Sequence, residues 1–196
     1  QAKPDRAQYP GLLHPLPVAK RCWDMVSMDF VGALPPSRQY NCILVVVDTF
    51  SKFDHFLPVK HPYIAQTIAQ LYIDQIYRLH GMPEAIISDR DAVFTSKVWQ
   101  EIFKLQGGEL KMSSPHHPQT DGQTERVNQC LETYLRCFVH SSPNNWSRWL
   151  ALPEFWYNST YHSTLNKTPF EVVYGQEPRH LGLIPEQATP IPELNE

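Results

Sequence analysis

The chain lacks the features that mark zinc-binding, secreted and membrane proteins. Its four cysteines form no Cys-x-x-Cys pair, the spacing that is usual in a structural zinc site. No run approaches the roughly 18 apolar residues that a membrane-spanning helix needs, and no charged start leads into an apolar stretch, as in a signal peptide. Two of the cysteines lie in apolar runs and resemble small core residues. We therefore expect a soluble protein of a reducing compartment, with no membrane partner.

An excess of positive charge is also missing. The formal net charge is −3, from 17 Lys and Arg against 20 Asp and Glu. Proteins that bind nucleic acid usually show a basic face, so this total counts against such a partner. A net charge of −3 still allows a local cationic stripe on the surface, because several of the acids belong to a candidate metal site described below.

Proline divides the 196 residues into three parts. Four of the 18 prolines lie in residues 1–22 and four more in residues 176–196. Such a density excludes a regular helix or a central strand. We therefore predict an extended arm over 1–22, one domain over 23–175 and an irregular tail over 176–196.

Hydrophobic periodicity within 23–175 predicts three strands, followed by helices that alternate with short strands. The expected strands cover 25–33, 41–48, 53–60, 85–89 and 109–112, and the expected helices cover 64–80, 97–105, 120–140, 146–162 (interrupted near Pro153) and 168–174. The last helix has proline at its first position and glycine after its end. This order predicts an α/β fold with a mixed sheet and helices on both faces, which fits the ribonuclease-H-like class.

Three carboxylates stand where strands and a helix could bring them together. Asp29 lies inside an apolar run, and Asp89 ends another. Glu125 follows Thr120, at the start of an expected helix, and 35 residues separate it from Asp89 (125 − 89 − 1 = 35). If the three converge, they form a site for divalent metal ions.

The expected helix that carries Glu125 has a polar side and an apolar side. Thr120 and Gln123 match a capping box at its start. At 100° per residue, an apolar stripe contains Val127, Cys130, Leu131, Tyr134 and Phe138, and the opposite side contains Asp121, Glu125, Asn128, Glu132 and Arg136. Glu125 therefore points away from the packing surface. Asp121 and Glu132 share its side and are alternatives for the same role.

Clustered carboxylates predict a particular chemistry. Two of them about 4 Å apart repel by roughly 4 kcal/mol at an effective dielectric of 20, so a protein keeps such a cluster when a cation occupies it. Oxygen ligands without sulfur or imidazole favour Mg²⁺ or Mn²⁺ over zinc. Two such ions can activate a water or a 3′-hydroxyl for displacement at phosphorus.

Several motifs together resemble the catalytic core of integrases from gypsy-type LTR retrotransposons. They are Met28-Asp29-Phe30, Ile87-Ser88-Asp89-Arg90-Asp91, the run from His117 to Glu125, Leu44 to Asp48 with Ser51-Lys52, Trp156-Tyr157-Asn158 with His162-Ser163, and Thr168 to Gly175. The likeness extends from about Trp23 to Gly175. The spacing from Asp89 to Glu125 equals that of the family's D,D-35-E signature.

The resemblance implies that Asp29, Asp89 and Glu125 are the catalytic residues and the ligands of two Mg²⁺ or Mn²⁺ ions. Such integrases process the 3′ ends of linear element DNA and join them to a target duplex. They work as multimers, and we expect this chain to form a homo-oligomer that acts on DNA in the nucleus. The family's upstream zinc domain and a complete C-terminal DNA-binding module are not seen in this sequence, so we expect an isolated catalytic core.

Other polar residues have both an ordinary and a functional interpretation. Asp48 ends a strand and is interpreted first as a turn residue, and Asp91 ranks below Asp89 as a ligand. His116 and His117 precede the helix of Glu125 and could touch phosphate. Residues near the start of that helix could hydrogen-bond DNA backbone, and the candidate DNA contacts are His117, Gln119, Gln123, Arg126 and Asn128.

Lysines, one arginine and tryptophans complete the candidate set. Lys97, Lys104, Lys111 and Arg136 are possible phosphate contacts, although scattered lysines are normally solvated surface. Trp146, Trp149 and Trp156 recur at helical spacing and are interpreted as core or subunit-interface residues rather than base-stacking groups.

Two further functions remain open from the sequence. A nuclease of the same fold could degrade RNA in RNA–DNA hybrids with the same metal chemistry. A scaffold derived from such an enzyme could bind DNA or dimerise without catalysis. Three intact carboxylates argue against the scaffold, because a scaffold has no reason to keep repelling acids together.

Overall fold

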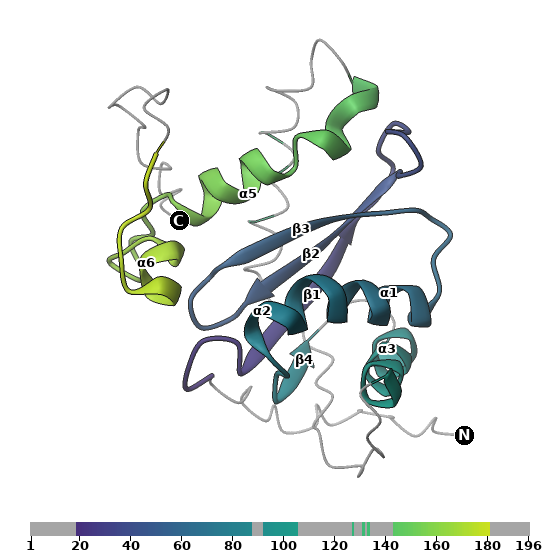
Figure 1. Cartoon of the computed structure of the whole chain (residues 1–196), viewed down its shortest axis with the longest axis horizontal. Helices are drawn as coiled ribbons and strands as arrows, with labels where there is room; N and C mark the ends of the chain where they lie inside the picture. Colours follow the sequence, from purple (N-terminus) through teal and green to yellow (C-terminus); the bar gives the residue numbers. More distant parts are fainter. Residues whose placement is uncertain are drawn as a thin grey trace, which may run out of the picture.

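The computed structural model describes residues 19–87, 92–105 and 143–180, together with residues 127, 131 and 133. Figure 1 shows a central sheet with helices on both sides. The mixed sheet that the sequence predicts is confirmed. No helix in the described ranges is long and apolar enough to cross a membrane.

Four strands form the sheet in the order β3-β2-β1-β4. They are β1 (Met25–Val31), β2 (Cys42–Asp48), β3 (Asp54–Val59) and β4 (Ala85–Ile87). Strands β1 and β3 each pair antiparallel with β2, and β4 runs parallel to β1. Strand β2 is buried along its whole length, as its β-branched, apolar sequence predicts. The strand expected over 109–112 lies outside the described residues.

One face of the sheet packs against α1 (Ala65–Tyr72), the π-helical turn η1 (Ile73–Tyr77), α2 (Arg78–His80) and α3 (Ala92–Leu105). The first three follow one another without a break and cover the predicted helix 64–80. Helix α3 begins five residues before the predicted start at Lys97. The core on this face is formed by Val26, Met28, Phe30, Leu44, Val46, Ile68, Tyr72, Ile76, Val98, Ile102 and their neighbours.

The opposite face packs against the 3₁₀ turn η2 (Pro143–Arg148) and α5 (Ala151–Asn158). Its core contains Trp146 and Leu150 together with Val31, Ile43, Val45, Val47, Phe56 and Tyr157. The sequence predicted one helix over 146–162, interrupted near Pro153, and this is corrected. Pro153 lies in the first turn of α5, where its missing N–H removes no hydrogen bond of the helix.

Helix α6 (Pro169–Tyr174) confirms its prediction from end to end. The Thr168 side chain accepts a hydrogen bond from the Glu171 N–H at 3.0 Å, and the Glu171 carboxylate accepts one from the Thr168 N–H at 2.9 Å. This is a capping box. Gly175 ends the helix at φ 69°, a left-handed conformation that glycine adopts without strain.

Helix α5 covers the exposed edge of β3 and satisfies its backbone. The Asn158 amide accepts from the Asp54 N–H and donates to the Asp54 carbonyl, both at 2.8 Å. The Glu154 carboxylate accepts from the Phe56 N–H at 2.9 Å. The next outward position is Pro58, which has no N–H to satisfy. The edge is therefore closed to pairing with another strand.

Candidate active site

Asp29 lies in the middle of β1, and its side chain is half-buried. It pairs with Val45 of β2, and paired residues of an antiparallel ladder point to the same face. Val45 belongs to the core on the α5 side of the sheet. Asp29 is thus a carboxylate on that face. Its Oδ1 accepts a hydrogen bond of 2.7 Å from the N–H of Phe30, which holds the carboxylate in one orientation.

The face that carries Asp29 also receives part of the helix that was predicted over 120–140. Positions 127, 131 and 133 are helical. Val127 and Leu131 are 1% and 2% exposed and pack with Val31 and Val45. This confirms the predicted apolar stripe at these two positions, and Thr133 is exposed. Glu125 and its competitors Asp121 and Glu132 lie outside the described residues.

Strand β4 brings a second candidate segment next to β1. In the parallel ladder, Met25 pairs with Ala85, and Ser27 pairs with Ile87. Asp89 is two positions after Ile87 in the chain. Asp89 and Asp91 lie outside the described residues. The structure therefore places Asp29 beside the strand that precedes Asp89 and on the face that Val127 and Leu131 cover.

Asp48 is a turn residue, as the sequence predicted first. Its side chain is fully buried. One carboxylate oxygen accepts from the N–H groups of Trp23 and Phe50, at 3.0 and 3.2 Å. The other accepts from the N–H and hydroxyl of Ser51. Four donors occupy the carboxylate and fix the β2–β3 connection, so Asp48 has a structural role.

A polar cluster that sequence reasoning missed lies between β3, α2 and α5. Nε2 of His55 is 2.9 Å from Nε2 of His80, and Nδ1 of His55 is 3.0 Å from Oε1 of Glu154. The His80 ring stacks on Trp23 with centroids 3.7 Å apart. Burial, and then the neighbouring His55, lower the pKa of His80 to about 4. The only sequence signal was a histidine within the β3 pattern.

Asp54 is the most unusual acid in this cluster. It is fully buried, and within the described part of the chain neither carboxylate oxygen has a hydrogen-bond partner. Burial, and then the charges of Glu154 and Asp48, raise its pKa well above the ordinary value. A neutral carboxyl group is what this environment favours. The cluster supports the junction of three elements and is separate from the site at Asp29.

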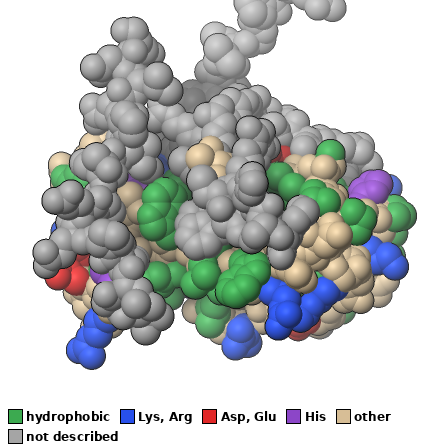
Figure 2. Space-filling model, turned by 90° about the horizontal axis from the view of Figure 1, so that it is seen from above, with side chains coloured by type: hydrophobic (Ala, Val, Ile, Leu, Met, Phe, Trp, Pro, Cys, Tyr) green, Lys and Arg blue, Asp and Glu red, His purple; other side chains and the backbone are tan. Residues whose placement is uncertain are grey.

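The remaining predicted contacts fall into two groups. Lys97 and Lys104 are exposed, and Lys104 lies 3.8 Å from Glu101, so both are ordinary surface residues of α3. Figure 2 shows Lys and Arg in separate groups along the rim of the face in view, with hydrophobic side chains between them. Outside the described residues lie Lys111, His116, His117, Gln119, Gln123, Arg126, Asn128 and Arg136.

Two of the three tryptophans follow their interpretation as core residues. Trp146 is 2% exposed, and its Nε1 donates to the Pro35 carbonyl at 2.7 Å. Trp156 is partly buried against the same core, while Trp149 is 49% exposed. Among the described residues, no group of three His, Cys, Asp or Glu side chains is placed to hold a metal ion.

Comparison with known protein families shows to which family the chain belongs. The model of the integrase core domain matches residues 20–118, about half of the sequence. The chain belongs to the integrase core domain family. The matched range contains Asp29, Asp89 and Asp91, and its described part comprises the sheet with α1, η1, α2 and α3.

Retrotransposon proteins are similar to this integrase core over most of its length. The Tf2-3 and Tf2-4 transposon polyproteins of Schizosaccharomyces pombe are each 40% identical to it over 168 residues, which is 86% of the chain. The chain spans only 13% of the length of these relatives. The resemblance to LTR-retrotransposon integrases is confirmed.

Solved structures show the same fold. The HTLV-2 integrase catalytic core domain in complex with magnesium, in its trimeric form, superposes with a TM-score of 0.59 at 20% identity, covering 79% of this chain and 99% of that one. The simian T-cell lymphotropic virus intasome in complex with the PP2A regulatory subunit B56 gamma gives 0.61 at 22% identity, covering 87% of this chain and 60% of that one. The ribonuclease-H-like class is thereby confirmed.

Proposed function

We propose that this chain is the catalytic core of an integrase, a metal-dependent polynucleotidyl transferase that processes 3′ DNA ends and joins them to target DNA. The observation that carries the proposal is the position of Asp29. It lies on the sheet face that Val127 and Leu131 cover, beside the strand that leads to Asp89. Membership of the integrase core family supports the same activity.

The β1–β4 register supports Asp89 as the second ligand. Each β1 residue pairs with the β4 residue 60 positions later (87 − 27 = 60). If this register continues for two residues, Asp89 stands opposite Asp29 (29 + 60 = 89). Neighbouring strands lie about 4.8 Å apart, a separation at which two carboxylates can share a cation and, without one, repel.

The helix supports Glu125 as the third ligand. Glu125 precedes Val127 by two residues, which is about 200° around a helix of 3.6 residues per turn. Because Val127 is packed into the core, this spacing keeps Glu125 out of the core contact. Its carboxylate is therefore available as the third ligand.

The residues of the chain fit Mg²⁺ or Mn²⁺ as the bound ion. All three proposed donors are carboxylates, and hard oxygen ligands suit these cations. When bound, two such ions supply an activated oxygen nucleophile and stabilise the leaving oxygen of an in-line displacement at phosphorus. Asp29 would hold one carboxylate oxygen toward the site, and the Phe30 N–H on Oδ1 would fix its direction.

We also propose the substrates of the chain, its oligomeric state and its location in the cell. The substrates are element DNA ends and a target duplex, and end processing is an endonuclease step. The HTLV-2 core domain is described in dimeric and trimeric forms, and we expect this chain to form a homo-oligomer as well. Because the target is chromosomal DNA, we expect it to act in the nucleus.

A joining assay tests the proposal. The 196-residue chain is incubated with Mn²⁺ and a pre-processed duplex end, and joined products are measured for the parent, Glu125→Gln and the matched control Glu132→Gln. We expect joining in the parent and in Glu132→Gln, and at least about a 100-fold loss in Glu125→Gln with the fold retained. Equal activity in both variants would remove Glu125 from the site. Digestion of an RNA–DNA hybrid without joined products would favour the ribonuclease.

A further inference from the structure

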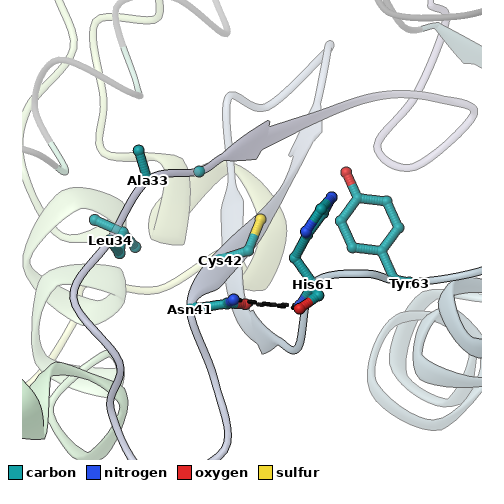
Figure 3. A pocket seen from close by; sticks show the side chains of 7 residues that line it. Ala33, Leu34, Asn41, Cys42, His61 and Tyr63 are labelled. Atoms are coloured by element: carbon teal, nitrogen blue, oxygen red, sulfur yellow. Dashed lines mark hydrogen bonds between the residues drawn. The ribbon is translucent and has the colours of Figure 1, made fainter.

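A pocket of about 380 Å³ lies where β1 ends and β2 begins. It is lined by residues 32–34, by Asn41 and Cys42, and by His61 and Tyr63. Figure 3 shows these side chains around the opening, with Tyr63 and His61 on one side and residues 33 and 34 on the other. Its volume falls in the range of small-molecule sites, about 300–1,000 Å³.

The aromatic wall of the pocket is connected to the candidate metal ligand. Tyr63 stacks on Phe30, with ring centroids 4.4 Å apart and an angle of 14° between the planes. The Phe30 N–H is the donor to Asp29 Oδ1. Tyr63 therefore packs on the side chain of the residue whose backbone N–H orients Asp29, with the Phe30 ring in the core on the α1 side of the sheet.

The opposite part of this wall is held by a polar clamp. The Asn41 side chain donates to the His61 carbonyl at 3.2 Å and accepts from the His61 N–H at 2.6 Å. The His61 ring meets Tyr63 edge-on, with centroids 5.5 Å apart and planes at 87°. Two rings are thus presented in a fixed arrangement on an otherwise exposed loop.

The composition of the pocket suits an aromatic ligand. None of the lining residues is acidic. The exposed Lys60 precedes the lining residue His61 in the chain. Stacking on aromatic side chains beside cationic groups is how proteins bind unpaired bases of nucleic acids, without strong sequence preference.

The distance from Asp29 fits the same DNA molecule. Gly32 follows Asp29 by three residues, which is roughly 10 Å along a strand and about three base steps of duplex DNA. We propose that the pocket receives an unpaired nucleobase of the DNA whose reacting phosphate lies at Asp29. This inference rests on the proposed function and assigns a base-binding subsite to it.

Two changes test the subsite from different directions. Tyr63→Leu removes the stacking ring. Gly32→Leu adds a side chain at a pocket-lining position where a Cβ meets no atom within 4 Å and φ is not positive, so the fold should tolerate it. Tyr161→Leu is the matched control, since Tyr161 is 54% exposed and does not line the pocket.

The readout is the fluorescence of 2-aminopurine placed in turn at each of the last few positions of a duplex end with unpaired terminal bases. All variants are made in an Asp29→Asn background, so that binding is measured without chemistry. We expect one position to show an emission change on binding. Both pocket variants should abolish this change and weaken binding of the DNA about tenfold, within the range for loss of one stacked base, while Tyr161→Leu keeps both.

Failure of this inference can be separated from failure of the proposed function. If the parent chain joins DNA but neither pocket variant alters the emission, the subsite is wrong and the function stands. If only Tyr63→Leu has an effect and Gly32→Leu has none, Tyr63 acts through Phe30, and the base-binding subsite is again wrong. If the parent does not join DNA, the proposed function fails, whatever the emission shows.

Discussion

Ser27 of β1 pairs with Ile87 of β4 in a parallel register. Each of these residues is followed, two positions later, by an aspartate. Side chains two apart on a strand point to the same face. The pairing therefore gives a structural reason for grouping Asp29 with Asp89, which the sequence suggests only through the motifs around them.

The first prediction concerns these two aspartates. Asp29→Asn and Asp89→Asn should each reduce Mn²⁺-dependent joining at least about 100-fold, because each removes a charged ligand while keeping the side-chain shape. Asp91→Asn is the matched control, two residues beyond Asp89, and should stay within a few-fold of the parent. Loss of activity in Asp91→Asn with retention in Asp89→Asn would move the ligand to Asp91.

The second prediction concerns stability and metal. The parent should unfold at a higher temperature when Mg²⁺ is added, because an ion that binds only the folded state stabilises it, by about 2.7 kcal/mol at 100 times its dissociation constant. Asp29→Asn should lose most of this gain. Thermal denaturation with and without Mg²⁺ measures both. An equal Mg²⁺ gain in parent and variant would place the stabilising ion elsewhere.

The third prediction concerns the edge of β3. Asn158→Ala removes both hydrogen bonds to the Asp54 backbone and leaves a buried N–H and a buried carbonyl unsatisfied. We expect a loss of about 2 to 4 kcal/mol in the free energy of unfolding, measured by urea denaturation. Asn145→Ala changes an exposed asparagine and should cost less than about 0.5 kcal/mol. Similar costs for both would show that α5 does not protect this edge.

The fourth prediction concerns pH. The pKa of His80 is about 4 in the folded chain against an ordinary 6.5. Between these values the unfolded chain binds a proton that the folded chain does not, so the free energy of unfolding should fall as pH falls from about 6.5 to 4. His80→Gln should reduce this slope relative to the parent. The raised pKa of Asp54 acts in the opposite sense and is common to both proteins.

Leu79→Gln provides the control for that measurement. Leu79 is 53% exposed, and its replacement removes no titratable group. The free energy of unfolding of this variant should therefore change between pH 6.5 and 4 as it does in the parent. An unchanged slope in His80→Gln would mean that His80 takes up its proton without loss of stability.

The sequence predicted the elements whose signals are local. Helix α6 has its cap residues Thr168 and Gly175 at each end, and β2 is a β-branched run. The start of α3 at Ala92 was missed because Val93, Phe94 and Thr95 favour strands locally. The π-helical turn Ile73–Tyr77 was missed because no residue type marks such a turn in the sequence.

The polar residues of the structure also divide into those that local sequence signals reveal and those that only tertiary packing reveals. Asp29 could be found because a charge inside an apolar strand is rare, and Val127 and Leu131 could be found from helical spacing. The cluster of His55, His80 and Glu154 could not, since its members come from three elements and meet only through tertiary packing. Asp54 gave no signal either, because its burial depends on α5 lying along β3.

The most direct test of the account is a crystal structure of the chain with Mn²⁺, in which anomalous scattering locates the metal. The account predicts Mn²⁺ about 2.0–2.2 Å from a carboxylate oxygen of Asp29 and from one of Asp89, with Glu125 completing the site. Mn²⁺ bound elsewhere, with the carboxylates of Asp29 and Asp89 too far apart to share an ion, would contradict it.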